Sequence, residues 1–397
     1  MLFARRTSWD LRTNRYTDAL DAHRRAGRKL LDLTSSNPTT IGLQYRGEEL
    51  LRALAHPAAL RYEPQPKGLL VARAAVAAYY AEHGAQISPD DLILTTSTSE
   101  AYSFVVRLLC DPGDALLVPT PSYPLFDSLA DIQDVKLVPY ELVYDHGWQI
   151  DFPSLRGALE RGESAGGRCR AVSVVHPNNP TGSYVKPPEA EELNRICVES
   201  SLAFIADEVF LDYSLSHETR LTFAANRNVT TFTLSGLSKI SALPQMKVAW
   251  IAVSGPQALK RDALARLEVI ADTYLSMNAP VQLAIPTMLE QRQSIQGQLM
   301  RRIRTNLQEL DAQLAAQKLC HRLDVEGGWY VVLRVPVTAS DEDFAIALLQ
   351  QRDVLVQPGH FYDFAAGGYL IVSLITQTDV FQTGITRLLE YVATIGR

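Results

Sequence analysis

The chain has 397 residues and a formal net charge of −6; 47% of its residues are hydrophobic and 21% are charged. This length favours two domains over one, and the composition is that of an ordinary globular protein. The acidic balance excludes the basic surface typical of nucleic-acid-binding proteins, and the apolar runs are far too short to cross a membrane. We expect a cytoplasmic protein, because the N-terminus has no apolar stretch long enough for a secretory signal.

The four cysteines, Cys110, Cys169, Cys197 and Cys320, are widely separated and form no C-x-x-C pair. This spacing predicts neither a zinc site nor a disulfide framework. Small buried thiols in a reducing compartment are the simplest interpretation, and we expect no metal.

From about residue 45 to residue 280, short apolar runs typical of buried strands alternate with helix-like stretches. The strand-like runs are 91–96, 115–120, 171–177, 202–209, 230–234 and 247–254. They are rich in β-branched residues and apolar on both faces. Such alternation predicts an α/β domain with a mostly parallel sheet sandwiched by helices.

After about residue 280 the pattern changes. A long helix-like stretch, 298–317, leads into two strand-like runs, 327–336 and 369–376, which are separated by a further helix-like stretch. This order predicts a smaller α+β domain. The first forty or so residues are expected to pack on it, so that 45–280 forms the large domain and 1–44 with 281–397 forms the small one.

Polar side chains follow several of the predicted strands of the large domain. In chain order they are Ser97, Thr98 and Ser99, then Tyr123, then Asn179, then Asp207, then Lys239. Each one alone has a structural explanation as a helix cap, a turn residue or a packing residue. Because the carboxyl ends of the strands form the ligand crevice in an open α/β sheet, their shared position favours a common site.

The chemistry of these residues fits an aromatic, phosphorylated aldehyde with a ring nitrogen. Ser97, Thr98 and Ser99 would lie at a helix N-terminus, which favours a phosphate. Tyr123 offers a flat ring for stacking, and Asp207 would keep the ring nitrogen protonated. Lys239 would form a Schiff base through its neutral amine.

Three motifs carry a family resemblance: HPNNPTG at 176–182, ADEV at 206–209 and GLSK at 236–239. These motifs occur in the same order in the pyridoxal-phosphate enzymes of fold type I that form the class I/II aminotransferase family. The chain resembles this family over nearly its full length. The resemblance implies that Lys239 binds the aldehyde of pyridoxal 5′-phosphate, Asp207 pairs with the ring nitrogen, Asn179 donates to the 3-oxygen and Tyr123 stacks on the ring. The residues that it places around the phosphate are Ser97, Thr98, Ser99, Ser238 and Lys247.

The stretch RYEPQPKG, 61–68, resembles a family segment whose tyrosine reaches the phosphate of the neighbouring subunit. That tyrosine is Tyr62 here, and the resemblance therefore implies a homodimer.

Two residues depart from the family around the cofactor. Lys247 stands where an arginine is usual, and it replaces a bidentate fork with a point charge. Phe210 stands where a tyrosine usually donates to the 3-oxygen.

The most consequential departure lies in the small domain, where Ile371 replaces the family arginine that binds the substrate α-carboxylate. An upstream glycine is also replaced, within TSSNPT, by Ser35 or Ser36, next to Asn37. Two explanations stay open: the substrate lacks an ordinary free α-carboxylate, or another cation supplies the charge. The candidate cations are Arg334, His360, Arg5 and Arg6.

The leading interpretation is an aminotransferase that moves an amino group between an amine or amino acid and a carbonyl compound. Lys239 would act as the general base after the substrate amine displaces it. The nearest alternative is a lyase, decarboxylase, racemase or cyclase that uses the same cofactor on an unusual amino acid. A DNA-binding regulator of this fold is disfavoured by the acidic charge, and an S-x-x-K match at 183–186 lacks the partner motifs of a serine acyl-transfer enzyme.

Overall fold

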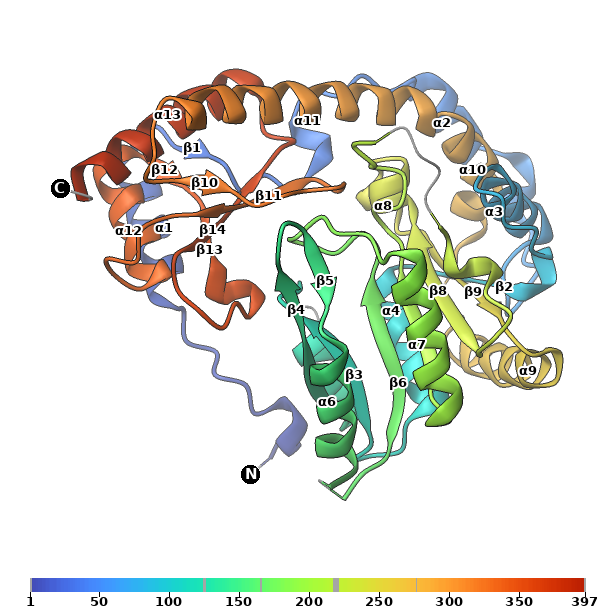
Figure 1. The fold of residues 1–397 in the computed structure, drawn as a ribbon. Coiled ribbons are helices and arrows are strands. Elements are labelled where there is room, and N and C mark those ends of the chain that lie inside the picture. The colour runs from blue at the N-terminus through green and yellow to red at the C-terminus, as the bar shows by residue number, and fades with distance from the viewer. Residues whose placement is uncertain (1, 124–125, 165, 217–220, 276, 396–397) are drawn as a thin grey trace.

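The computed structural model describes residues 2–123, 126–164, 166–216, 221–275 and 277–395. Its ribbon is shown in Figure 1. An eight-stranded sheet occupies the middle of the chain, and a four-stranded sheet lies in its C-terminal part. Among the residues described, no helix is both long and apolar enough to span a membrane.

The large sheet is mostly parallel, as the sequence predicts. Its strands are β2 (Leu92–Thr95), β3 (Ala115–Thr120), β4 (Lys136–Tyr144), β5 (Trp148–Ile150), β6 (Cys169–Val175), β7 (Ala203–Asp207), β8 (Thr231–Gly236) and β9 (Ala249–Ser254). They lie in the order β2-β9-β8-β7-β6-β3-β4-β5. The ladder from β8 through β4 is parallel. Strand β9 runs antiparallel between β2 and β8, and β5 runs antiparallel on β4.

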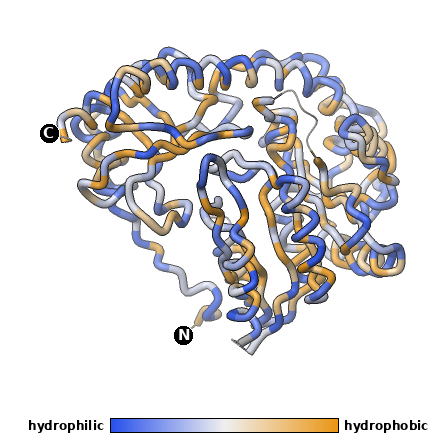
Figure 2. Tube along the Cα trace, viewed as in Figure 1, coloured by the Kyte–Doolittle hydropathy of each residue, from blue (hydrophilic) through white to orange (hydrophobic). Residues whose placement is uncertain are grey.

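Helices cover both faces of this sheet. One face carries α4 (Thr98–Leu109), α5 (Phe126–Gln133) and α9 (Gln257–Tyr274). The other face carries α6 (Phe152–Ser164), α7 (Pro187–Glu199), α2 (Gly47–Leu54), α3 (Leu70–Glu82) and α10 (Ala279–Glu290). Because both faces are covered, the central strands are apolar on both sides, and Figure 2 shows hydrophobic residues along them. The α/β fold class is therefore confirmed.

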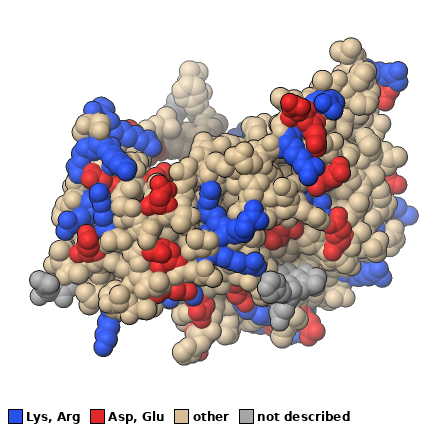
Figure 3. Space-filling model, turned by 90° about the horizontal axis from the view of Figure 1, so that it is seen from above, with Lys and Arg blue, Asp and Glu red and all other residues tan. Residues whose placement is uncertain are grey.

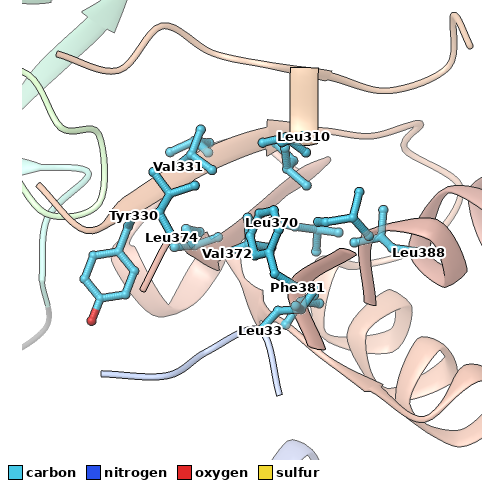
Figure 4. Packing of buried hydrophobic residues seen from close by; sticks show 14 of the residues in the cluster. Leu33, Leu310, Tyr330, Val331, Leu370, Val372, Leu374, Phe381 and Leu388 are labelled. Atoms are coloured by element: carbon cyan, nitrogen blue, oxygen red, sulfur yellow. The ribbon is translucent and has the colours of Figure 1, made fainter. Parts of the chain in front are cut away.

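The C-terminal part is an α+β unit. Its antiparallel sheet has the order β10 (His321–Arg322), β11 (Tyr330–Arg334), β14 (Tyr369–Ser373) and β13 (Gln357–Pro358). Its helices are α1 (Arg15–Arg25), α11 (Arg292–Ala315), α12 (Asp341–Arg352) and α13 (Thr378–Ile395). Leucine, valine and phenylalanine side chains from the sheet, α11 and α13 pack together in its core, whereas the ring of Tyr330 points away from them (Figure 4).

The N-terminal residues join this unit through a second, two-stranded sheet. Strand β1 (Leu31–Asp32) pairs in parallel with β12 (Val354–Leu355), and Leu33 packs in the same core. Helix α10 packs against α2 and α3 and shares their hydrophobic cluster, so packing groups it with the large sheet. The division into 45–280 and 1–44 with 281–397 stays a prediction.

The residues before α1 extend away from the C-terminal unit toward the strands β3 and β4 (Figure 1). There Arg6 pairs with Asp134 at 2.9 Å, and the indole of Trp9 donates to Asp131 over 3.0 Å.

On the face that carries α11, seen from above in Figure 3, basic and acidic side chains lie interspersed. This distribution agrees with the modest net charge of −6.

Candidate active site

A cavity of about 260 Å³ lies at the carboxyl ends of β6, β7 and β8. Ligands bind at this edge of open α/β sheets. Strands β11 and β13 of the small sheet contribute the opposite wall. The lining residues are Ser36, Thr98, Tyr102, Tyr123, Val175, Asn179, Asp207, Val209, Phe210, Gly236, Ser238, Lys239, Ala249, Tyr330, Gln357 and Tyr362.

Lys239 lies in the short helix α8 (Leu237–Ile240), directly after β8. Its Nζ is 4.7 Å from the centre of the Trp329 ring and 5.4 Å from that of Phe210. Burial lowers the pKa of Lys239 to about 8, and the nearby carboxylate of Asp207 opposes this change. At physiological pH a larger fraction of the Lys239 amine is therefore neutral than in an exposed lysine. The neutral form is the one that can act as a nucleophile or a base.

Side-chain hydrogen bonds to backbone carbonyls fix the turn that carries the lysine. The hydroxyl of Tyr213 donates to the carbonyl of Lys239 over 2.6 Å. Gln296, from α11, donates to the carbonyl of Ile240 over 2.9 Å, and Tyr45 donates to that of Ala242 over 2.8 Å. Both parts of the molecule thus position the lysine.

Asp207 ends β7, and its carboxylate faces the cavity. Its Oδ2 accepts a hydrogen bond from the hydroxyl of Tyr102 at 3.2 Å, and its Oδ1 accepts one from the backbone N–H of Val209 at 3.1 Å. Burial raises the pKa of Asp207 to about 6, against the effect of these bonds and of the Lys239 charge. The carboxylate is therefore mostly ionised at neutral pH and available to hold a protonated nitrogen.

Glu208, the next residue, is a buried acid that sequence reasoning missed. Its carboxylate accepts hydrogen bonds from the Thr222 hydroxyl at 2.7 Å and from the Phe223 backbone at 2.6 Å. Burial raises the pKa of Glu208 to about 7. It does not line the cavity.

The N-terminus of α4 faces the cavity at Thr98. Ser97 is the N-cap, and its Oγ accepts from the backbone N–H of Glu100 at 3.1 Å. Glu100 accepts in turn from the backbone of Thr96 at 2.7 Å. The first N–H groups of a helix lack intrahelical partners and favour an anion. Ser97 and Ser99 are not among the lining side chains.

Asn179 carries an orphaned polar atom, since its Oδ1 is buried and has no hydrogen-bond partner within the described part of the chain. Its side chain lines the cavity. A tight turn positions it: the Asn178 backbone donates to the Ser183 carbonyl, and Gly182 donates to Asn178, both over 2.8 Å. A buried amide without a partner is costly, so this atom indicates a ligand with a polar group.

Tyr123, 46% exposed, stands at the rim of the cavity, and Ser238 lines it beside the lysine. Lys247 is exposed, with a left-handed backbone (φ 54°), and lies outside the lining set. Tyr62 is 80% exposed and lines a different hollow, together with Met277.

Some of the candidate substrate residues line the cavity and others do not. Ser36 lines the cavity, but Asn37 caps the turn Pro38–Thr40 by accepting from Thr39. Arg334 stacks over the Tyr369 ring at 4.2 Å. It and the exposed His360 are not among the lining residues.

Ile371 is fully buried in β14, and it pairs with Val332 of β11 and Gln357 of β13. It does not line the cavity either. Of the two remaining cations, Arg6 pairs with Asp134, and Arg5 lies with it in the N-terminal segment.

Four lining residues with polar side chains were missed by sequence reasoning: Tyr102, Tyr330, Gln357 and Tyr362. Tyr102 lies one helical turn beyond Thr98 on α4, so the period of the helix could have placed both on one face. The other three come from the small sheet and the turn Gly359–Tyr362. Nothing in their local sequence distinguishes them from core residues.

The fold and the cavity define an α/β enzyme in which a buried, partly neutral lysine lies near an ionised carboxylate. The family model for aminotransferase class I and II matches residues 28–380, and the chain belongs to this family. No group of three or more histidine, cysteine or acidic side chains in the described ranges could hold a metal ion.

Curated relatives agree with this assignment. The chain is 26% identical over 382 residues to the glutamate-pyruvate aminotransferase AlaA of Haemophilus influenzae, covering 92% of this chain and 91% of that one. It is 26% identical over 377 residues to the alanine aminotransferase of Mycobacterium tuberculosis, with coverages of 91% and 85%.

Solved structures show the same fold. An alanine aminotransferase from Pyrococcus furiosus superposes with a TM-score of 0.86 at 22% identity, over 96% of this chain and all of the other. An aminotransferase from Escherichia coli superposes with a TM-score of 0.83, also at 22% identity, over 98% of this chain and all of that one.

Proposed function

We propose that this protein is a pyridoxal-phosphate-dependent aminotransferase that moves an amino group between an amine or amino-acid donor and a carbonyl acceptor. The observation that carries the proposal is the convergence of Lys239, Asp207 and Asn179, from three different strand ends, on one cavity. Family membership supports the reaction class, and the geometry supports these residues as its machinery.

The residues present fit pyridoxal phosphate. The buried, unpartnered Oδ1 of Asn179 would accept a hydrogen bond from a donor group of the ligand, and the Nδ2 of the same amide would donate to the 3-oxygen of the ring. Asp207 suits a protonated ring nitrogen, and Tyr123 offers an aromatic face at the rim. Thr98 and the N-terminus of α4 suit a phosphate, and Ser97, Ser99, Ser238 and Lys247 remain its further proposed neighbours.

When bound, the cofactor supplies a carbonyl group that accepts the amine and a ring that withdraws electrons. Lys239 would first hold the cofactor covalently and then, once displaced by the substrate amine, act as a neutral base through Nζ. Through Nζ, Lys239 would take the proton from the amine-bearing carbon and later release it again, so that it would end unchanged. Asp207 holds its partner nitrogen protonated throughout.

The overall reaction is balanced between its two substrates. The donor carbon loses its amino group and a hydrogen and becomes a carbonyl, which is a two-electron oxidation. The acceptor carbonyl is reduced by the same two electrons and becomes the amine. Water consumed in releasing one carbonyl product is returned when the acceptor condenses, so no external oxidant is needed.

Tyr62 supports a homodimer as part of the proposal. It is 80% exposed and does not line the cavity of its own chain. Leu60, close to it in the chain, is 96% exposed, so both side chains are free to contact a second subunit. In the proposed dimer, Tyr62 of the partner subunit would complete the phosphate site.

The test begins with the protein reconstituted with pyridoxal phosphate and desalted. The names of the relatives recommend L-alanine and L-glutamate as donors, with pyruvate and 2-oxoglutarate as acceptors; simple amines and amino amides complete the panel. We expect conversion of the cofactor to its amine form and appearance of the carbonyl product. Lys239→Ala should abolish both, whereas Lys318→Ala, an exposed lysine, should change neither.

The alternative reactions give different products. Decarboxylation releases carbon dioxide, racemisation inverts the amino acid, and elimination or cyclisation leaves an altered carbon skeleton without aminated cofactor. If such products accumulate and no donor in the panel aminates the cofactor, the aminotransferase proposal is wrong.

A further inference from the structure

Gln357 presents a carboxamide to the cavity from the small sheet. It lies in β13, where its Cα is paired with that of Ile371 in β14. Ile371 is fully buried and absent from the cavity wall, whereas Gln357 lines that wall. At this position of the small sheet, the group that meets the cavity is therefore an amide and not a hydrocarbon.

Tyr362 fixes the orientation of this amide. Its hydroxyl donates a hydrogen bond to the Oε1 of Gln357, and the tyrosine is itself 3% exposed. The backbone carbonyl of Tyr362 accepts from the N–H of Ser122 over 3.0 Å, next to Tyr123. With its Oε1 engaged by Tyr362, the Gln357 amide can donate its two N–H groups to a ligand.

The wall around this amide is polar but uncharged. Among the described lining residues, the only charged side chains are Asp207 and Lys239, at the strand ends of the large sheet. The side chains on the small-sheet side are Ser36, Tyr330, Gln357 and Tyr362. Arg334, the arginine on β11, donates to the carbonyl of Gly367 over 3.2 Å and stacks on Tyr369 outside the cavity.

We propose that Gln357, oriented by Tyr362, recognises the polar end of the amine substrate, and that this end is a neutral carboxamide rather than a free carboxylate. A carboxylate placed against the small-sheet side of the cavity, where the described lining side chains are uncharged, loses its hydration and gains no charged partner there. A carboxamide costs less to desolvate because it is neutral. Its carbonyl can accept a hydrogen bond from the Gln357 amide, which is neutral as well. The inference rests on the proposed function of the same cavity.

The experiment measures amination of the cofactor in the reconstituted enzyme, with L-alaninamide and L-alanine as paired donors. We expect the wild type to show a kcat/KM at least tenfold higher for the amide. Gln357→Leu should reduce kcat/KM for the amide by about tenfold and leave that for alanine nearly unchanged. Gln357→Arg should reverse the preference, because a guanidinium pairs with a carboxylate. Tyr362→Phe should weaken the amide preference about threefold, mainly through KM, because it frees the rotation of the amide.

Gln350→Leu is the matched control, since Gln350 is an exposed glutamine on α12, and it should behave as the wild type. Thermal melting and cofactor absorbance of each variant separate misfolding from loss of recognition. If the holoenzyme forms but neither donor nor any other amine reacts, the proposed function fails. If the wild type reacts and alanine is as good a donor as alaninamide, or Gln357→Leu leaves the preference unchanged, the proposed recognition by Gln357 is overturned.

Discussion

The hydroxyl of Tyr102 donates a hydrogen bond to the Oδ2 of Asp207 over 3.2 Å, and both residues line the cavity. Tyr102 is 2% exposed and belongs to α4, whose N-terminus also faces the cavity. One helix therefore presents an anion site at its first turn and, one turn later, a donor that orients the carboxylate. The bond also stabilises the charged form of Asp207 and limits the rise of its pKa.

Tyr102→Phe tests this relationship. Burial already raises the pKa of Asp207 to about 6, and loss of the donor should raise it further. The neutral fraction of Asp207 then grows between pH 6 and pH 8, so we expect about tenfold weaker binding of pyridoxal phosphate at pH 6.5 and a smaller loss at pH 8.5. Spectroscopic titration of the apoprotein with the cofactor measures both values.

Tyr140→Phe is the control, because Tyr140 is equally buried and donates to the Ser173 carbonyl over 2.8 Å without lining the cavity. A loss of cofactor affinity in Tyr102→Phe that is the same at both pH values would mean that the hydroxyl acts by packing alone.

The large sheet was predictable from sequence because its central strands are buried on both faces. Runs such as 115–120 and 230–234 then consist of apolar and β-branched residues and stand out from the helices between them. Strands β4 and β5 were missed, since β4 is mostly exposed or half-exposed and contains Pro139. Near the edge of the sheet such a strand is not buried on both faces, so its sequence lacks the continuous apolar run that marks the central strands.

The site was predictable in its large-sheet half for the same reason. Lys239, Asp207 and Asn179 follow easily recognised strands, so their positions at one edge could be inferred before the fold was known. Gln357 and Tyr362 could not be inferred in this way. They meet the cavity only because β13 pairs with β14 and the small sheet packs over the large one, which is a long-range relationship without a local sequence signal.

Glu208 makes the apoprotein sensitive to pH. Burial raises its pKa to about 7, from an unfolded value near 4.5. The folded state therefore holds a proton that the unfolded state releases between about pH 4.5 and pH 7, and stability falls as the pH rises through this window. Each pKa unit corresponds to about 1.4 kcal/mol.

Glu208→Gln should remove this pH dependence and keep the hydrogen bonds to Thr222 and Phe223, because an amide can accept from one and donate to the other. Relative to the wild type, we expect a gain in the free energy of unfolding of order 2 kcal/mol at pH 8 and little difference at pH 4.5. Urea unfolding of the apoprotein at both pH values measures it. Glu290→Gln, at an exposed glutamate on α10, should produce no such change; a gain of equal size at both pH values would contradict the assignment.

Tyr213 positions the backbone of Lys239, the proposed catalytic lysine, since its hydroxyl donates to the Lys239 carbonyl over 2.6 Å. Tyr213→Phe removes one of two donors to this carbonyl, which also accepts from the Ala242 backbone N–H over 3.2 Å, and the loss of one such hydrogen bond costs about 0.5–1.5 kcal/mol. We expect a lower melting temperature and, in the holoenzyme, a lower kcat for amination of the cofactor with KM little changed.

Tyr45→Phe removes a similar bond from the same turn, to Ala242 at 2.8 Å, but three residues beyond the lysine. It should lower stability and leave kcat close to the wild-type value. If both variants lower kcat equally, the turn acts as a single rigid unit and Tyr213 has no special relation to the lysine.

Phe210 gives a last prediction, on the charge of the nitrogen that would link Lys239 to the cofactor. The ring of Phe210 lines the cavity 5.4 Å from Nζ and offers no hydrogen-bond donor. A phenolic oxygen on the bound cofactor is then less stabilised as an anion, and it favours a protonated nitrogen beside it. Phe210→Tyr supplies a donor of the kind expected of this family.

We therefore expect Phe210→Tyr to lower the midpoint of the pH-dependent absorbance of the reconstituted enzyme by about one pH unit, equivalent to about 1.4 kcal/mol. Phe210→Leu, which adds no donor, should leave the midpoint near that of the wild type. The measurement needs no substrate, so it is independent of which amine the enzyme prefers. Equal midpoints in the wild type and Phe210→Tyr would show that the introduced hydroxyl does not reach the cofactor, because a bond to a charged oxygen of order 1.5 kcal/mol or more could not leave the titration unchanged.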